Sequence, residues 1–383
     1  ILPYFSDEIG NAQSVHSFGQ RAKAALENAR RQVAALINAS PSEIVFVSGG
    51  TEADNQAIRG IADVHGARGK HIITTSIEHP AVLATCESLE QSGFNVTFLA
   101  VSKSGLIDVN EVRESITGDT ILISVMHANN ETGTIQPIAE IGRLVAETRA
   151  SGNTHIHFHS DAVQSVGKIP VNVNELGVDL LSISGHKIHG PKGVGALYVR
   201  KGTRLGRLMY GGHHERDRRP GTENVPGAVG LGLAAELAAL KLDERSASMR
   251  ELRDYLEEQV TSPLSGVTIN GDRMQRLPNI SNMSFSGVDG ESLLIALDLK
   301  GIAVSTGSAC SSGSLEPSHV LTAMGLDRPK IRGSLRFSLS AYTSRDEIDN
   351  TVCALEEIIT RLREMSADED PDWLPATEEI STS

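Results

Sequence analysis

The sequence predicts an α/β fold in which helices flank a mostly parallel central sheet. Short runs rich in β-branched residues alternate with longer amphipathic stretches, and this alternation is typical of a parallel sheet covered by helices. At 383 residues, the chain also exceeds the usual size of a single core, so we expect two domains. The predicted strands of the larger domain are Ile44–Val47, Ile72–Thr74, Val96–Leu99, Ile121–Val125, Ile156–His159, Leu180–Ser184 and Ala196–Val199.

The stretches between these strands are expected to be helices on the faces of the sheet, for example Ala22–Ile37 and Ile138–Ala150. After the last strand, an Ala-, Leu- and Gly-rich stretch over Val225–Leu240 is expected to be a buried helix. A charged amphipathic helix over Glu244–Val260 follows it, with apolar residues at helical spacing. We place a domain boundary between these two helices.

Residues 1–243 would then form a large domain, and residues 244–365 a smaller C-terminal α/β domain. The small domain has strand candidates at Ile280–Phe285 and Ser334–Ser340. Its last helix is expected from Ser344 to about Met365, because the chain there begins with Ser-Arg-Asp-Glu, a capping-box pattern.

The composition argues against several classes of protein. Forty-eight acidic and thirty-five basic residues give a net charge of −13, which disfavours binding to nucleic acid or to an anionic membrane surface. No apolar run approaches the length of a membrane span, and the start of the chain lacks the pattern of a signal peptide. Three scattered cysteines without a CxxC pair fit a reducing cytoplasm. Residues 366–383 are acidic, with two prolines, and are expected to be a disordered tail.

A glycine-rich turn, SGGTEADN at residues 48–55, joins a predicted strand to a predicted helix. Glycines such as Gly50 let the backbone approach a ligand, and the free N–H groups at a helix start, with the Thr51 hydroxyl, suit a phosphate. An ordinary capped turn between a strand and a helix is the alternative. On its own, the motif leaves both interpretations open.

Two further motifs follow predicted strands. Lys187 ends the segment LLSISGHK, where burial could lower the pKa of its amine as Schiff-base chemistry requires. Asp161 and Gln164 lie at the edge where open α/β sheets bind ligands, and a carboxylate there could pair with a pyridinium nitrogen. The alternatives are a lysine that reaches solvent and an aspartate that caps a helix.

Histidines raise two further possibilities. His155, His157 and His159 alternate, so a strand would place all three on one face. Three rings in a row serve tetrahedral zinc poorly, and we expect no metal. His79 follows a predicted strand at the same sheet edge and could stack on a ligand ring, cap a helix or lie in the core.

The three cysteines differ in their surroundings. Cys310 lies in STGSACSSGS, a polar loop with little to pack against, which suggests a reactive thiol. Cys86 and Cys353 lie in amphipathic stretches and are expected to be structural. Arginines in the motifs RRPGTEN and RGSLR, the latter ending at Arg336, could bind carboxylates or pair with surface acids.

Taken together, these motifs resemble those of the cysteine desulfurases of the NifS/IscS type, in the class V aminotransferase family of fold-type I pyridoxal phosphate enzymes. The resemblance runs from Asn11 to about Arg361. Eight segments occur in the family's order and spacing: SGGTEADN, EHPAV, HANNETG, DAVQSVGK, SGHKIHGPKGVGALYVR, RPGTEN, STGSACSSGSLEPSHVL and RGSLRFSLS. The large domain would then bind the cofactor, and the small domain would carry the cysteine loop.

The resemblance implies that pyridoxal 5'-phosphate is the cofactor and that Lys187 binds it covalently. Asp161 would pair with the pyridine nitrogen, Gln164 would bond the ring hydroxyl, and His79 would stack on the ring. The implied cofactor-binding residues are Gly50, Thr51, His79, Asn130, Asp161, Gln164, Ser184, His186, Lys187 and Thr222.

Within that set, Thr51, Ser184 and His186 would hold the phosphate. Thr222 would reach the phosphate from a second subunit, which implies a homodimer.

The resemblance also implies how substrate is handled. Asn130 and Arg336 would bind L-cysteine, Arg336 through the substrate carboxylate. Cys310 would take the sulfur as a persulfide, so that the implied catalytic residues are Lys187, Cys310 and His79. The long loop around Cys310 resembles that of the subgroup whose cysteine swings from the cofactor to an acceptor protein.

The predicted function is therefore that of a cysteine desulfurase, which converts L-cysteine to L-alanine and delivers sulfur to iron–sulfur cluster assembly or another pathway. A sulfur-acceptor or scaffold protein is the expected partner. The alternatives are selenocysteine lyase, which shares the fold and cofactor, and a non-catalytic scaffold that binds partner proteins. Family members usually begin earlier, with a Tyr-x-Asp-x-Ala-Thr-Thr segment that is absent here, and the acidic tail matches no ending of the family.

Overall fold

The computed structural model describes residues 1–306 and 317–368. Within these residues the strands form two sheets, one of seven strands in the order β1-β7-β6-β5-β4-β2-β3 and one of four in the order β10-β11-β9-β8. The strands of the large sheet are β1 (Ile44–Val47), β2 (His71–Thr75), β3 (Asn95–Leu99), β4 (Thr120–Ser124), β5 (His157–Asp161), β6 (Leu180–Ser184) and β7 (Gly195–Val199). Each predicted strand of the large domain is thus confirmed: β1 and β6 have the predicted ends, and the ends of the other strands shift by at most two residues.

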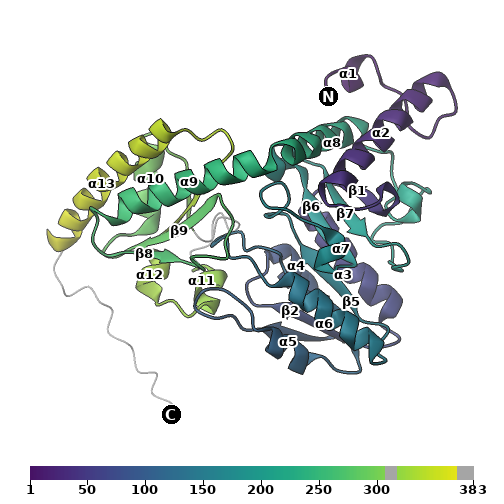
Figure 1. The fold of residues 1–383 in the computed structure, drawn as a ribbon, viewed down its shortest axis with the longest axis horizontal. Coiled ribbons are helices and arrows are strands. Elements are labelled where there is room, and N and C mark those ends of the chain that lie inside the picture. The colour runs from purple at the N-terminus through teal and green to yellow at the C-terminus, as the bar shows by residue number, and fades with distance from the viewer. Residues whose placement is uncertain (307–316, 369–383) are drawn as a thin grey trace, which may run out of the picture.

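The large sheet is mostly parallel, as expected. Strands β3, β2, β4, β5 and β6 pair in parallel, and β7 runs antiparallel to both β6 and β1. Its helices and 3₁₀ turns are α1 (Pro3–Ser6), α2 (Ser17–Leu36), η1 (Pro41–Glu43), α3 (Gly50–His65), α4 (Pro80–Glu90), α5 (Val109–Ser115), α6 (Ile138–Ala150), α7 (Val173–Leu176), η2 (Gly185–Ile188), η3 (Glu215–Asp217) and α8 (Val225–Leu240). Figure 1 shows these helices packed around the sheet.

Alternate residues of the strands enter two separate cores, one on each face of the sheet. In β1, Ile44 and Phe46 belong to the core beneath α2, α6 and α8, whereas Val45 and Val47 belong to the core beneath α3 and α4. This division follows from the two-residue period of a strand. It explains why β1 is apolar along its whole length, as expected of a strand buried on both faces.

The small domain contains the second sheet and the helices around it. Its elements are α9 (Leu242–Thr261), β8 (Val267–Asn270), β9 (Ile280–Phe285), α10 (Gly290–Asp298), β10 (Ser305–Thr306), α11 (His319–Ala323), α12 (Arg328–Arg332), β11 (Ser334–Ser338) and α13 (Arg345–Asp368). All of its strand pairs are antiparallel within the described residues. The sequence did not predict the short strands β8 and β10.

Two expectations at the end of the chain need correction. Strand β11 ends at Ser338 rather than Ser340, and helix α13 continues to Asp368, three residues into the predicted tail. The rest of the tail, residues 369–383, lies outside the described residues.

The two domains meet along the chain at a sharp bend. Helices α8 and α9 form an angle of 75° at a short break, close to the proposed boundary at residue 243. Within the described residues no single helix is long and apolar enough to cross a membrane, although this bent pair passes that test by length and composition. Helices α11 and α12 pack on the large domain, because Val320, Leu321 and Ile331 share a core with Ile77 and Met126.

Candidate active site

The candidate site lies at the carboxyl edge of the parallel strands. Asp161 is the last residue of β5, Ser184 is the last residue of β6, and Lys187 follows in the turn η2. His79 lies just beyond β2, at the start of α4. Parallel strands point their carboxyl ends to one edge of a sheet, so residues far apart in the sequence meet there.

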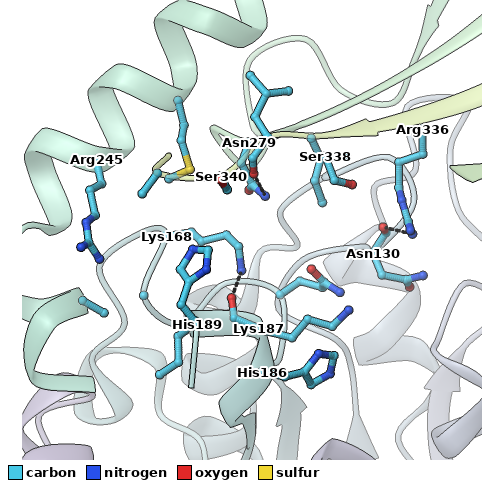
Figure 2. A pocket seen from close by; sticks show the side chains of 18 residues that line it. Asn130, Lys168, His186, Lys187, His189, Arg245, Asn279, Arg336, Ser338 and Ser340 are labelled. Carbon is cyan, nitrogen blue, oxygen red and sulfur yellow. Dashed lines mark hydrogen bonds between the residues drawn. The ribbon is translucent and has the colours of Figure 1, made fainter. Parts of the chain in front are cut away.

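A cavity of about 290 Å³ opens between the two domains at this edge. Its lining includes Asn130, Gln164, His186 and Lys187 from the large domain and Arg336 from the small domain. Figure 2 shows the Lys187 side chain extending along the cavity toward Asn130 and Arg336. Five of the predicted site residues are therefore brought together in one space.

The other predicted residues do not line this cavity. Gly50, Thr51 and Ser184 lie at the start of α3 and the end of β6, while His79 and Asp161 lie deeper at the ends of their elements. His79 and Asp161 nevertheless border the same region, since Lys187 acts electrostatically on both of them. Thr222 is exposed on a separate segment between η3 and α8.

Lys187 owes its position to a tight turn. The Gly185 N–H donates to the Val194 oxygen at 3.0 Å, and Gly190 donates back to the Gly185 oxygen at 2.9 Å. A Cβ atom added to Gly185 would lie 3.0 Å from the Val194 main-chain oxygen, so a side chain there would crowd the turn. The turn leaves Lys187 half-buried, where its amine reaches the cavity.

Asp161 offers a buried carboxylate at the floor of the site. Its side chain is 7% exposed, and its Oδ1 atom accepts a hydrogen bond from the Val163 N–H at 2.9 Å. Burial raises the pKa of Asp161 to about 6, and the charge of Lys187 opposes this rise. A cationic ring nitrogen beside it would stabilise the ionised form, so the residue fits the role of partner to a pyridinium.

Two other buried acids surround Asp161, and the sequence analysis assigned them no role. Burial raises the pKa of Glu78 to about 8, although its Oε1 atom accepts hydrogen bonds from the Thr75 hydroxyl and the Met126 N–H, both at 2.8 Å. Burial, followed by repulsion from Asp161, raises the pKa of Asp54 well above its ordinary value. The only sequence signal was an acid inside each of two motifs, SGGTEADN and EHPAV.

His79 is fixed as the N-cap of α4. Its Nδ1 atom accepts a hydrogen bond from the Ala81 N–H at 3.1 Å. Burial lowers the pKa of His79, and the charges of Lys187 and His319 lower it further. A neutral ring that accepts at Nδ1 is held in one orientation, which suits stacking on a flat ligand. Capping and stacking are therefore compatible roles.

The start of α3 is open in the way that a phosphate requires. The N-cap residue Gly49 provides no side-chain cap, and a Cβ atom added to it would meet nothing within 4 Å. At Gly50 an added Cβ would lie 3.7 Å from the Ser184 Cβ and 2.9 Å from a Val163 methyl group, so only glycine fits. Thr51 is exposed next to this opening. The first N–H groups of α3 and the Ser184 hydroxyl can thus face one anion.

The opposite wall of the cavity comes from the small domain. The Arg336 guanidinium donates a hydrogen bond from Nη1 to the Asn130 main-chain oxygen at 2.9 Å. Burial raises the pKa of Glu131, next to Asn130, to about 7, although the Ser318 hydroxyl and Arg336 stabilise its charged form. Asn279 also lines the cavity, and its buried Oδ1 atom has no hydrogen-bond partner within the described residues. The sequence analysis did not single out Asn279.

Thr222 lies on a segment that is tied to the start of α3. The Arg219 guanidinium donates to Glu52 Oε1 at 2.9 Å, and Glu52 Oε2 accepts from the Ser48 N–H at 2.7 Å. Gln56 donates to the Arg218 main-chain oxygen at 2.7 Å. The segment is therefore held firmly while the Thr222 side chain stays exposed.

The cysteines separate differently from expectation. Cys310 lies outside the described residues. Cys86 is buried in α4, as expected, and burial raises its pKa to about 12, so it is a poor nucleophile at neutral pH. Cys353 is exposed on α13. The expectation that it packs in the core is therefore wrong.

The three alternating histidines do not share one strand face. Strand β5 begins at His157, so His155 precedes it and contacts Arg68 instead. His159 is fully buried, with its Nδ1 atom 2.9 Å from the Ser124 hydroxyl and its Nε2 atom 3.0 Å from the Ser182 hydroxyl. Among the described residues, no group of three potential metal ligands is found.

Comparison with known proteins gives a consistent result. The family described as aminotransferase class-V matches residues 1–351. A protein named cysteine desulfurase IscS from Dictyoglomus turgidum is 51% identical over 366 residues, which cover 96% of this chain and 91% of that protein. A protein named cysteine desulfurase from a Nostoc species is 50% identical over 381 residues, covering 99% of this chain and 94% of that protein.

Solved structures agree with the sequence relatives. A structure described as a NifS-like protein has a TM-score of 0.86 at 38% identity and covers 96% of this chain and 94% of its own. Another, described as SspA in complex with cysteine, has a TM-score of 0.77 at 38% identity and covers 89% of this chain and 94% of its own.

Proposed function

The chain belongs to the class-V aminotransferase family, and we propose that it works there as a pyridoxal phosphate-dependent cysteine desulfurase of the sulfurtransferase type. It takes sulfur from L-cysteine, releases L-alanine and keeps the sulfur as a persulfide on Cys310, for iron–sulfur cluster assembly or another acceptor protein. The observation that supports this most is the cavity in which Lys187 of the large domain faces Arg336 of the small domain.

The residues around this cavity fit pyridoxal phosphate. Asp161 would hold the ring nitrogen, His79 would cover the ring, and the open start of α3 with Ser184 would hold the phosphate. When bound, the cofactor would draw electrons from the α-carbon of the substrate. The sulfur atom of the substrate would thereby become reactive toward a thiolate. The uncapped helix start and the buried carboxylate are the two features of the structure that support this assignment.

The chain's own side chains would divide the remaining work. Lys187 binds the cofactor through its amine and, when free, moves a proton at the α-carbon of the substrate. Arg336 offers a guanidinium fork to the substrate carboxylate, and Asn130 stands beside it. The Cys310 thiolate forms a bond to the substrate sulfur as the carbon–sulfur bond breaks, and the carbon then takes up a proton to give alanine.

We further propose that the protein is a cytoplasmic homodimer. Thr222 is exposed on a firmly held segment, which fits a residue that completes the phosphate site of a second copy. Cys86 and Cys353 are free thiols, which fits a reducing compartment.

The test is to supply the purified protein with pyridoxal phosphate and L-cysteine, and to measure L-alanine and protein-bound sulfur together. Equal amounts of the two in the first turnover are expected, and Lys187→Ala should produce neither. Alanine without bound sulfur would contradict the persulfide step. A markedly faster reaction with L-selenocysteine would instead support selenocysteine lyase.

A further inference from the structure

We infer that Lys168 is a positioning residue for Lys187. Lys168 binds the main chain of Lys187, and its positive charge repels the Lys187 amine. The value of a neutral Lys187 amine rests on the proposed function, whereas the contact between the two lysines does not depend on it. Lys168 Nζ donates a hydrogen bond to the Lys187 main-chain oxygen at 3.1 Å. Figure 2 shows that the Lys187 side chain leaves this peptide in the other direction, toward Asn130.

The chain brings Lys168 to this point through a turn that only glycine permits. Main-chain N–H groups of Lys168 and Ile169 both donate to the Ser165 oxygen, at 3.0 and 3.1 Å, and the intervening Gly167 has a φ of 74°. A Cβ atom added to Gly167 would lie 2.7 Å from an Ile188 methyl carbon. The segment therefore lies directly against the turn that carries Lys187.

The contact places the Lys168 ammonium group at a main-chain oxygen near the end of a helical turn. The turn η2 is a single 3₁₀ turn, Gly185–Ile188, and its end is closed by the His189 N–H donating to the Gly185 oxygen. The last carbonyl groups of a helical turn have no partner within it, and a cation at that end is favourable. Lys168 supplies this cation at Lys187, the residue whose position matters for the chemistry.

Lys168 is also a charge within the same cavity. The charged and titratable groups that line this cavity or act on Lys187 are Lys168 from the turn after β5, Asp161 from β5, His79 from the start of α4, His186 and His189 from η2 and its end, Arg245 from α9 and Arg336 from β11. Burial, followed by repulsion from Lys187, lowers the pKa of Lys168 to about 8. The repulsion is mutual, so a charged Lys168 favours the neutral, nucleophilic form of the Lys187 amine.

The experiment measures the Lys187 amine in cofactor-free protein, so that failure of the proposed desulfurase reaction would not affect it. Limiting amounts of an amine-reactive reagent are added from about pH 6 to about pH 10, and the labelled Lys187 peptide is quantified by mass spectrometry. In Lys168→Met, the labelling midpoint should move to higher pH, with about 3–10-fold less labelling near neutral pH, since one pKa unit corresponds to tenfold. Lys168→Arg, which keeps the charge, should keep the wild-type labelling near neutral pH.

Two comparisons separate positioning from general stability. Lys201→Met, at an exposed lysine of the same domain, should leave the Lys187 profile unchanged. If Lys168 had only a structural role, Lys168→Met would have a lower free energy of unfolding than the wild-type protein but the same Lys187 labelling midpoint. That result would overturn the inference. Circular dichroism shows that each variant is folded before labelling. If Lys168→Met does not fold, Lys168→Gln provides the same loss of charge.

Discussion

The Arg336 guanidinium donates a hydrogen bond to the Asn130 main-chain oxygen at 2.9 Å, and this contact joins strand β11 of the small domain to the loop after β4 of the large domain. Both residues were implied in substrate binding by resemblance alone. The structure brings them together across the cavity, with Lys187 on the opposite wall. Relative movement of the domains would therefore change the substrate pocket directly.

Replacing the cofactor lysine should abolish covalent attachment. In Lys187→Ala, added pyridoxal phosphate should no longer be fixed to the protein by borohydride, because the half-buried amine at the cavity is lost. Peptide mapping of the wild-type protein after reduction should find the cofactor on the peptide that contains Lys187. Lys201→Ala, at an exposed site, serves as the matched control, and cofactor fixed to any other lysine would refute the assignment.

The three cysteines should behave differently toward L-cysteine. Cys310→Ser should still bind cofactor and substrate, but sulfur transfer should slow by at least about a thousandfold, roughly 4 kcal/mol of barrier, because a hydroxyl is far less nucleophilic than a thiolate. Cys353→Ser is the sharper control because that thiol is exposed, whereas Cys86 is buried with a raised pKa. Mass spectrometry after brief exposure to L-cysteine should find the added sulfur on the Cys310 peptide. Sulfur on Cys353 at full activity would overturn the mechanism.

The stability of the protein should depend on pH through Glu78. Burial raises the pKa of Glu78 from its ordinary 4.5 to about 8, so between these values the folded protein holds a proton that the unfolded chain has lost. The contribution of Glu78 to the free energy of unfolding must then fall as pH rises through this window, by up to about 1.4 kcal/mol per pH unit. Glu78→Gln removes this contribution, so its stability relative to wild type should rise from about pH 5 to about pH 8.

Urea denaturation at both ends of that pH range checks the prediction. Glu87→Gln, at an exposed position on α4, the helix that follows Glu78, should show the same pH dependence as the wild-type protein. A constant difference between Glu78→Gln and wild type at all pH values would show that Glu78 does not bind the proton.

A buried ion pair should anchor the segment that leads to Thr222. Glu215 accepts two hydrogen bonds of 2.7 Å from Arg30 and one of 2.9 Å from the Phe46 N–H, and both charged residues are buried. Glu215→Gln leaves the buried Arg30 charge with only the partly exposed Glu27 as an ion-pair partner, and should lower the free energy of unfolding by about 3 kcal/mol. Denaturation in urea measures this loss.

The control for this prediction is an ion pair on the surface. Arg113 and Glu147 lie 3.3 Å apart with exposed side chains, so Glu147→Gln should change stability by less than about 1 kcal/mol. Equal effects of the two substitutions would contradict the anchoring role of Glu215. That role matters locally because Glu215, Arg216 and Asp217 all have left-handed φ values of 45°, 56° and 66°, a strained backbone that needs support.

The protein should be a dimer that shares its phosphate sites. Light scattering at low protein concentration should give twice the mass of one chain. Thr222→Ala should remain dimeric and bind pyridoxal phosphate about ten- to a hundredfold more weakly, since a hydrogen bond to a charged group contributes about 1.5–3 kcal/mol. A monomer with full cofactor occupancy would exclude the shared site.

Much of this protein could be predicted without its structure. The strands of the large sheet follow from local apolar runs, and helices α6 and α8 begin and end where the pattern predicts. The motif residues Lys187, Asp161 and Ser184 lie together at one sheet edge, because strand direction alone decides where their ends meet. Short elements were missed, such as β8 and β10, since four or two residues carry too little periodicity.

Only the tertiary structure decided which groups touch and which are desolvated. The bond from Lys168 to Lys187, the contact between Arg336 and Asn130, and the exposure of Cys353 depend on how whole elements pack. The raised pKa of Glu78 likewise arises from complete burial, which sequence spacing does not reveal. A local pattern determines the face on which a side chain lies, whereas its partner and its solvation are set by segments distant in the chain.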